Sequence, residues 1–140
     1  MPYATQQDII DRYGDDALIV ASDRDGDGLV DVDTVSKALA DATADIDSYV
    51  ARKYALPLPT VPDVLVRICV DIAMYRLSPE PGVGTEDRRT RYDDAIAFLK
   101  DVAKGVAGLG LEESPPTSVG AVTVAGPSRV FSRNSMKGLA

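Results

Sequence analysis

The sequence of 140 residues contains no histidine, no tryptophan and only one cysteine, Cys69. Without histidine, no imidazole is present to act as a general base, to activate a serine or cysteine nucleophile, or to bind zinc. A single cysteine cannot form a disulfide within the chain, which excludes a disulfide-stabilised scaffold. Because Cys69 lies in the apolar stretch LVRICVDIAM, we expect its side chain to be a small buried hydrophobic group. The commonest catalytic arrangements are therefore absent.

Long apolar runs are also missing. None approaches the roughly 20 residues that a helix needs to cross a bilayer, and the opening MPYATQQDII lacks the basic-then-apolar order of a secretory signal. We therefore expect no contact with a membrane and a protein that is made in the cytoplasm. Hydrophobic residues make up 45% of the chain and charged residues 26%, which suits one soluble domain with a real core.

The charge is unevenly distributed along the chain. Residues 114–140 contain Arg129, Arg133 and Lys137 but no acid, so they carry +3; since the whole chain carries −7, residues 1–113 carry −10. An acidic body repels phosphate, so specific binding of nucleic acid is not expected. A basic arm beside an acidic body instead indicates contact with an acidic protein surface, such as another copy of this chain.

The hydrophobic pattern predicts a mainly α protein. We expect a small bundle of four to five helices over residues 1–111 and an extended basic arm over residues 112–140, in which GAVTVAG (120–126) is compatible with one short strand. Apolar residues recur at steps of three and four in the segments 5–14, 33–54, 62–77 and 85–104. A short helical turn is expected to start at Asp15 or Asp16 and to run through 17–21. The helix at 62–77 has the widest apolar stripe and should be the most buried.

Capping residues mark where the helices begin. Thr5 with Asp8 resembles a capping box, either Asp31 or Asp33 suits the start of the longest helix, and Thr85 suits the start of the last one.

An acidic loop precedes the longest helix and matches D-x-D-x-D-G in its first six positions. In such a loop Asp23, Asp25 and Asp27 converge on one point, the Leu29 carbonyl adds an oxygen, and Asp31 acts directly or through water. Hard oxygens of this kind suit calcium, so the segment 23–34 is a candidate calcium site. Val30 stands where such loops place an apolar residue that faces the core.

Position twelve of the calcium loop departs from the pattern, because Thr34 stands where a bidentate glutamate is expected. This change should weaken the site or favour a mostly hydrated ion. The alternative interpretation is a polar turn that only caps the following helix. No other feature of the sequence requires a cofactor.

Two further charged groups have structural interpretations. Asp41, Asp45 and Asp47 lie on the longest helix without pocket-forming neighbours, and a solvated face is favoured over acid–base chemistry. Arg88, Arg89 and Arg91 lie among acidic residues, so surface ion pairing is favoured over phosphate binding.

The chain resembles the small head–tail connector proteins of Mu-like phages and prophages. The resemblance rests on an ordered series of segments: YATQQDIIDRYG, DRDGDGLVD, DSYVARKYALPLP, VPDVLVRICVDIAMYRL, RYDDAIAFLKDVAKG with LGL after it, and the terminal RVFSRNSMKG. It implies a non-enzymatic virion protein of the neck, assembled in the host cytoplasm. It further implies a ring, twelve-fold by resemblance, that lies under the portal protein and joins the DNA-filled head to a stopper or tail-completion protein. DNA would pass nearby without specific binding.

The basic arm suggests how such a ring would dock. We expect Val130 and Phe131 to anchor in an apolar pocket of the portal or of a neighbouring subunit, while Arg129, Arg133 and Lys137 meet carboxylates. An inert tail is the alternative. For the whole protein, the alternative function is a calcium-responsive helical binding module.

Overall fold

A computed structural model describes residues 1–78 and 85–115, and these residues form five helices. The prediction of a mainly α protein is confirmed. The described part of the chain contains no strand, and the candidate strand at 120–126 lies outside it. The helices are α1 (Gln6–Tyr13), α2 (Asp15–Ser22), α3 (Val32–Val50), α4 (Asp63–Leu77) and α5 (Thr85–Lys104).

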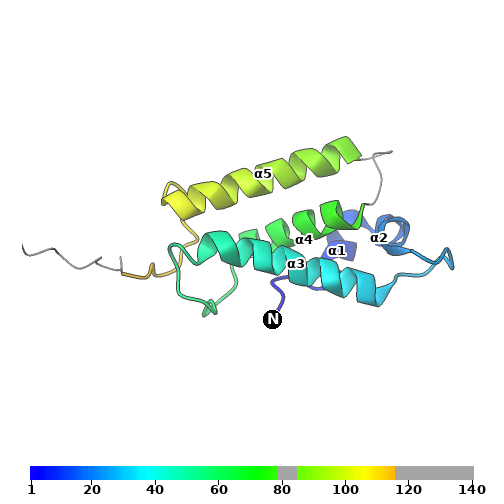
Figure 1. Cartoon of the computed structure of the whole chain (residues 1–140), viewed down its shortest axis with the longest axis horizontal. Helices are drawn as coiled ribbons and strands as arrows, with labels where there is room; N and C mark the ends of the chain where they lie inside the picture. The colour runs from blue at the N-terminus through cyan, green and yellow to red at the C-terminus, as the bar shows by residue number, and fades with distance from the viewer. Residues whose placement is uncertain (79–84, 116–140) are drawn as a thin grey trace, which may run out of the picture.

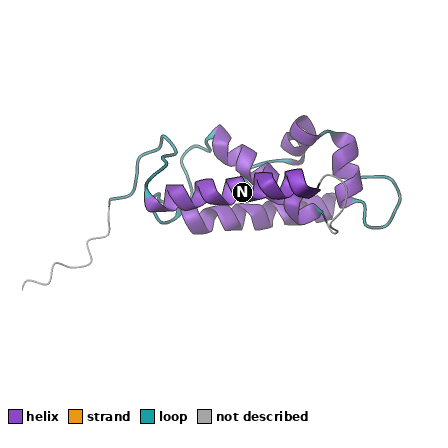
Figure 2. Cartoon of the chain, turned by 90° about the horizontal axis from the view of Figure 1, so that it is seen from above, coloured by secondary structure: helices purple, strands orange, loops and turns teal. Residues whose placement is uncertain are grey.

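Helix α4 is the centre of the bundle. It lies lengthwise beside α3 and α5, while α1 and α2 cover one end of it (Figures 1 and 2), and it contacts all four other helices. Since it has neighbours on all these sides, its apolar side chains are removed from water around most of its circumference. The prediction that this helix is the most buried is confirmed; its buried residues are Leu65, Ile68, Cys69, Val70, Asp71, Ile72, Ala73, Met74 and Leu77.

Local hydrogen bonds explain where α1 begins and ends. The Asp8 amide donates to the Thr5 hydroxyl at 3.3 Å, and the Thr5 amide donates to the Asp8 carboxylate at 2.7 Å, so the predicted capping box is confirmed. Gly14 ends the helix with φ at +87°, a conformation that a residue with a Cβ atom adopts only at a cost. Helix α2 therefore starts directly after the turn.

Helix α3 ends earlier than its apolar pattern predicted. It stops at Val50, and residues 51–54 form turns in which the amides of Lys53 and Tyr54 both donate to the Val50 carbonyl at 3.0 Å. These bonds tighten the last turn and satisfy a carbonyl that the helix leaves free. Tyr54 is still buried, as its place in the pattern predicted.

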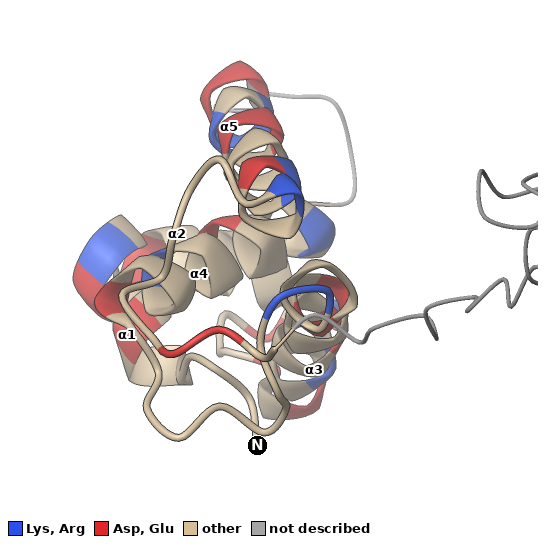
Figure 3. Ribbon diagram, turned by 90° about the vertical axis from the view of Figure 1, so that its left-hand side faces the viewer, with Lys and Arg blue, Asp and Glu red and all other residues tan. Residues whose placement is uncertain are grey.

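The starts of α4 and α5 each differ by one position from prediction. Pro62 occupies the position before α4 rather than its first turn, and α5 begins at Thr85 itself rather than after it. Along α5, acidic and basic residues are interspersed (Figure 3). Arg91 pairs with Asp87 at 3.0 Å and Arg89 lies 3.9 Å from Asp93, so the predicted surface ion pairing is confirmed for these two. Arg88 instead donates to the Ser78 hydroxyl at 2.6 Å.

A buried carboxylate joins α1 to α4. The Asp71 side chain on α4 is only 7% exposed, and it accepts hydrogen bonds from Arg12 Nε at 2.9 Å, from Arg12 Nη2 at 3.3 Å and from the Tyr13 hydroxyl at 2.8 Å. Burial and the hydrogen bond to this carboxylate raise the pKa of Tyr13 to about 12. The Arg91 guanidinium lies 5.3 Å from the centre of the Tyr13 ring, which brings α5 into the same contact.

Replacing Asp71 with alanine should lower the free energy of unfolding by about 2–3 kcal/mol, because Arg12 and Tyr13 would lose their shared acceptor. The measurement is urea unfolding. The matched control is Asp45→Ala, which removes the acceptor of the more exposed ion pair with Arg76 and should cost less than about 1 kcal/mol. Equal losses in the two variants would show that the buried network contributes nothing special.

Candidate functional site

The acidic loop between α2 and α3 brings together three of the carboxylates that the sequence predicted as ligands. Asp23, Asp25 and Asp27 each present an oxygen, and these three oxygens lie within 4.8 Å of one another. The glycines between and after them make this convergence possible, since Gly26 and Gly28 have φ values of +78° and +79° that favour glycine. The spacing of the motif therefore corresponds to a real cluster of hard oxygen atoms.

Asp23 also organises the backbone of this loop. Its Oδ1 atom accepts from the amides of Gly26 at 2.7 Å and Asp27 at 3.2 Å, and its Oδ2 atom accepts from the amide of Gly28 at 3.0 Å. The hydrogen bond from Gly28 is the main reason that the pKa of Asp23 lies below its usual value. The carboxylate form of Asp23 thus stabilises the turn even without a cation.

Asp31, the predicted fourth side-chain ligand, does not join the cluster within the described structure. Its Oδ1 atom accepts from the Thr34 amide at 3.2 Å and its Oδ2 atom accepts from the Thr34 hydroxyl at 2.6 Å. The Thr34 hydroxyl is the main cause of the lowered pKa of Asp31. The residue is the N-cap of α3, which decides between the two capping candidates in favour of Asp31 over Asp33.

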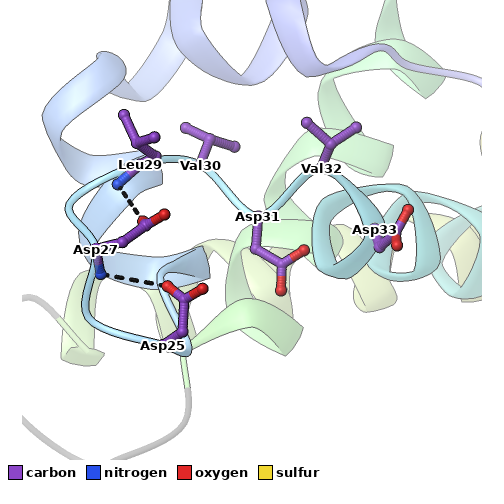
Figure 4. A pocket seen from close by; sticks show the side chains of 7 residues that line it. All are labelled: Asp25, Asp27, Leu29, Val30, Asp31, Val32 and Asp33. Atoms are coloured by element: carbon purple, nitrogen blue, oxygen red, sulfur yellow. Dashed lines mark hydrogen bonds between the residues drawn. The ribbon is translucent and has the colours of Figure 1, made fainter.

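The opposite side of the loop is apolar. Leu29, Val30 and Val32 point to one side of the backbone, and Asp31 points to the other (Figure 4). Val30 is half-buried and packs against the core, as predicted. Leu29 is 66% exposed and Val32 is 61% exposed. Both border a shallow hollow of about 300 Å³ that Asp25, Asp27 and Asp33 also line. The sequence predicted a role only for the Leu29 carbonyl, and the exposure of Leu29 and Val32 was not predicted.

The beginning of the predicted arm is held at the other end of the bundle. The Ser114 amide donates to the Lys53 carbonyl at 2.8 Å, and the Leu109 amide donates to the Tyr54 hydroxyl at 3.0 Å. These contacts fasten the chain after α5 to the end of α3 that lies opposite the acidic loop (Figure 1). The boundary between bundle and arm at 111/112 stays a prediction.

The residues predicted to dock on a partner lie beyond the described part of the chain. They are Arg129, Val130, Phe131, Arg133 and Lys137.

Other candidate groups have structural partners. Asp45 pairs with Arg76, and Asp47 accepts a hydrogen bond from the Tyr3 hydroxyl, so these carboxylates hold neighbouring elements together. Cys69 is fully buried, as predicted, and its burial raises the pKa of its thiol, which disfavours the reactive thiolate.

The comparison with protein families gives the decisive match. The family described as Bacteriophage Mu, Gp36 matches residues 3–125. This chain belongs to that family. Among proteins of the Gp36 family, it is 38% identical to "Mu-like prophage FluMu protein gp36" of Haemophilus influenzae, over 97% of this chain and 96% of the relative. It is 35% identical to "Gene product J" of Escherichia phage Mu, over 95% of this chain and 96% of that protein.

These matches make the chain a protein of a Mu-like phage or prophage. In the described part of this Gp36-family member, every helix is too short or too polar to span a membrane.

If Asp23 organises the loop through backbone hydrogen bonds, Asp23→Ala should lower the melting temperature in the presence of a chelator. Asp25→Ala is the matched control and should have little effect, because among the described residues Asp25 accepts one hydrogen bond, from the Asp27 amide at 3.2 Å. Thermal unfolding followed by circular dichroism measures both. An unchanged melting temperature in Asp23→Ala would mean that the loop does not need this carboxylate for its fold.

Proposed function

We propose that this Gp36-family protein is a virion structural protein, a head–tail connector that forms a ring under the portal and joins the DNA-filled head to the stopper or tail. In this proposal it has no enzymatic role. It resides in the neck of the virion after assembly in the host cytoplasm. Its partners are copies of itself, twelve in the ring by resemblance, the portal protein, and a stopper or tail-completion protein.

The single observation that carries the proposal is the difference between the two ends of the bundle. The acidic loop lies at one end and the start of the basic arm at the other (Figure 1). A closed ring requires a heterologous contact, in which one surface of a subunit meets a different surface of its neighbour. A subunit with two unlike ends supplies such a pair of surfaces. Membership of a phage Mu family agrees with this use.

The charge of the body supports a channel through which DNA passes without being bound. Residues 1–113 carry a formal charge of −10. An acidic surface repels the phosphate backbone, so DNA that moves through the ring would not be retained by it.

A second function is favoured by the carboxylate cluster. We propose that the loop 23–34 binds calcium weakly and that the chain is then a calcium-responsive binding module. The convergence of Asp23, Asp25 and Asp27 supports this proposal, whereas the use of Asp31 as a helix cap limits the site to fewer side-chain ligands. Such a site suits an ion that keeps much of its water.

Deleting residues 127–140 tests the connector proposal in a Mu-like phage that depends on this gene. We expect the truncated chain to keep its helical content and melting temperature, because the core cluster and hydrogen bonds described for residues 1–78 and 85–115 all remain in it. Heads and tails should accumulate separately, as seen by electron microscopy, because the truncated ring lacks its docking residues. Infectious virions at normal yield would contradict the docking role of the arm.

A matched pair of triple variants separates the effect of position from that of charge. The arm variant is Arg129→Ala, Arg133→Ala and Lys137→Ala. The body variant is Arg89→Ala, Lys100→Ala and Lys104→Ala, which removes the same charge from exposed positions of α5. Only the arm variant should block joining. If both block it equally, the arm has no special role.

Calcium should raise the melting temperature if the second proposal holds. A ligand at ten times its dissociation constant stabilises a folded protein by about 1.4 kcal/mol, which is a rise of about 5 °C for a domain of this size. The double variant Asp25→Asn with Asp27→Asn should lose the effect, and Asp93→Asn with Asp94→Asn on α5 should keep it. If about 10 mM calcium neither shifts the melting temperature nor gives a heat of binding by calorimetry, the calcium proposal is wrong.

A further inference from the structure

Exposed aliphatic side chains gather near the two ends of the bundle. Leu29 and Val32 lie at the loop end, 66% and 61% exposed, and Val106 lies at the arm end, 77% exposed. Scattered single residues of this kind are ordinary on protein surfaces. The loop pair is different, because both residues line one hollow, together with Val30 and Asp31, and are three positions apart in the sequence. This hollow has no partner within the described chain.

We propose that the hollow beside Leu29 and Val32 is the docking site for residues 127–137 of a second copy of this chain. The inference rests on the proposed function, since it identifies the contact that would link neighbouring subunits of the ring. In it, Val130 and Phe131 of one copy cover the exposed aliphatic pair of the next. Arg129, Arg133 and Lys137 lie beside the aspartates that flank the hollow.

Charge complementarity argues for this occupant. The segment 23–33 contains five aspartates and one arginine, a formal charge of −4, whereas residues 127–137 contain three cations and no acid. Asp25 and Asp27 line the hollow together with the exposed aliphatic pair. A ligand that fits must therefore combine an apolar centre with flanking positive charge. The sequence Arg129-Val130-Phe131 has this combination.

The chain is long enough for a second copy to be the occupant, and the ring of the proposed function requires such a contact between neighbouring subunits. The chain after α5 is held at the end of α3 opposite the acidic loop, where the Ser114 amide donates to the Lys53 carbonyl (Figure 1). Helix α3 separates these two ends by 19 residues, or about 28 Å. If a neighbouring subunit packs its acidic-loop end against the arm end of this one, the neighbour's hollow and the start of the arm lie at the same interface. The 14 residues from Pro115 to Arg129 span up to about 46–50 Å when extended. This length suffices to reach a neighbour's hollow. It also exceeds the distance of about 28 Å to the chain's own hollow, so the crosslinking experiment distinguishes the two occupants.

Crosslinking between two singly substituted chains tests the proposal. Full-length Leu29→Cys is mixed with full-length Phe131→Cys in a chelator, with a short bis-maleimide reagent, and dimers are counted on a denaturing gel. The matched control replaces Leu29→Cys by Val106→Cys, an exposed aliphatic position at the opposite end. The unsubstituted chain controls for Cys69, which is fully buried.

We expect roughly tenfold more dimer from the Leu29 pair than from the Val106 pair, because docking raises the local concentration of the two thiols. Raising the salt from about 0.1 M to about 1 M shortens the screening length from about 10 Å to about 3 Å, and it should reduce the yield. Adding Asp25→Lys and Asp27→Lys to the Leu29→Cys chain should reduce it further.

Three results would overturn the proposal. Equal dimer yields from both pairs would mean that contact is unspecific. No dimer at a protein concentration of about 1 mM would mean that the arm docks elsewhere, as it would if the portal alone were its partner. The third result concerns the double variant Leu29→Cys/Phe131→Cys. If its two thiols crosslink within one chain, so that the product is a monomer at every dilution, each arm covers its own hollow.

Failure of this inference is distinguishable from failure of the connector proposal. If the thiols do not crosslink but phage particles still require the chain to join heads to tails, only the docking site is wrong. If particles join without the chain, the connector proposal fails, whatever the gel shows.

Discussion

The burial of α4 between the other four helices is the constraint on which the rest of the structure depends. Its apolar surface is too wide for one partner, so α3 and α5 must lie along it and α1 and α2 must cover one end. Because α4 is enclosed, its one buried carboxylate, Asp71, needs hydrogen-bond donors from a neighbouring helix. Arg12 and Tyr13 of α1 supply them. A buried carboxylate without such donors would cost several kcal/mol, so packing and hydrogen bonding select the same arrangement of helices.

Much of this arrangement could be predicted from the sequence because its causes are local. The capping box of Thr5 and Asp8 and the apolar stripe of α4 are properties of adjacent residues, and both are confirmed. The end of α3 was predicted four residues too late, because Tyr54 continues the apolar spacing although the helix has already stopped. Tyr54 is buried instead by segments far along the chain, including Leu109, whose amide donates to its hydroxyl. Spacing alone does not distinguish these two routes to burial.

The acidic loop shows the same division. The convergence of Asp23, Asp25 and Asp27 follows from their spacing and from the glycines, and it was predicted. The separate use of Asp31 follows from a competition that the motif does not describe. A carboxylate just before a helix can accept from free amides of its first turn, and the Thr34 hydroxyl adds a further donor. Having threonine instead of glutamate at position 34 therefore has two effects. It removes the twelfth-position ligand of the calcium loop, and its hydroxyl holds the Asp31 carboxylate away from the cluster.

The enclosure of α4 also determines which surfaces remain for assembly. Long helices packed side by side cover one another laterally. Exposed aliphatic side chains are found instead on the short helix α2, at Val20, and at or beyond the ends of the long helices, at Leu29, Val32 and Val106. Since α3 separates the acidic loop from the start of the arm, the two ends present different residues as well as different positions. A contact between identical ends would bring like charges together. Unlike ends favour association in one direction, and a unidirectional contact with the right rotation closes into a ring.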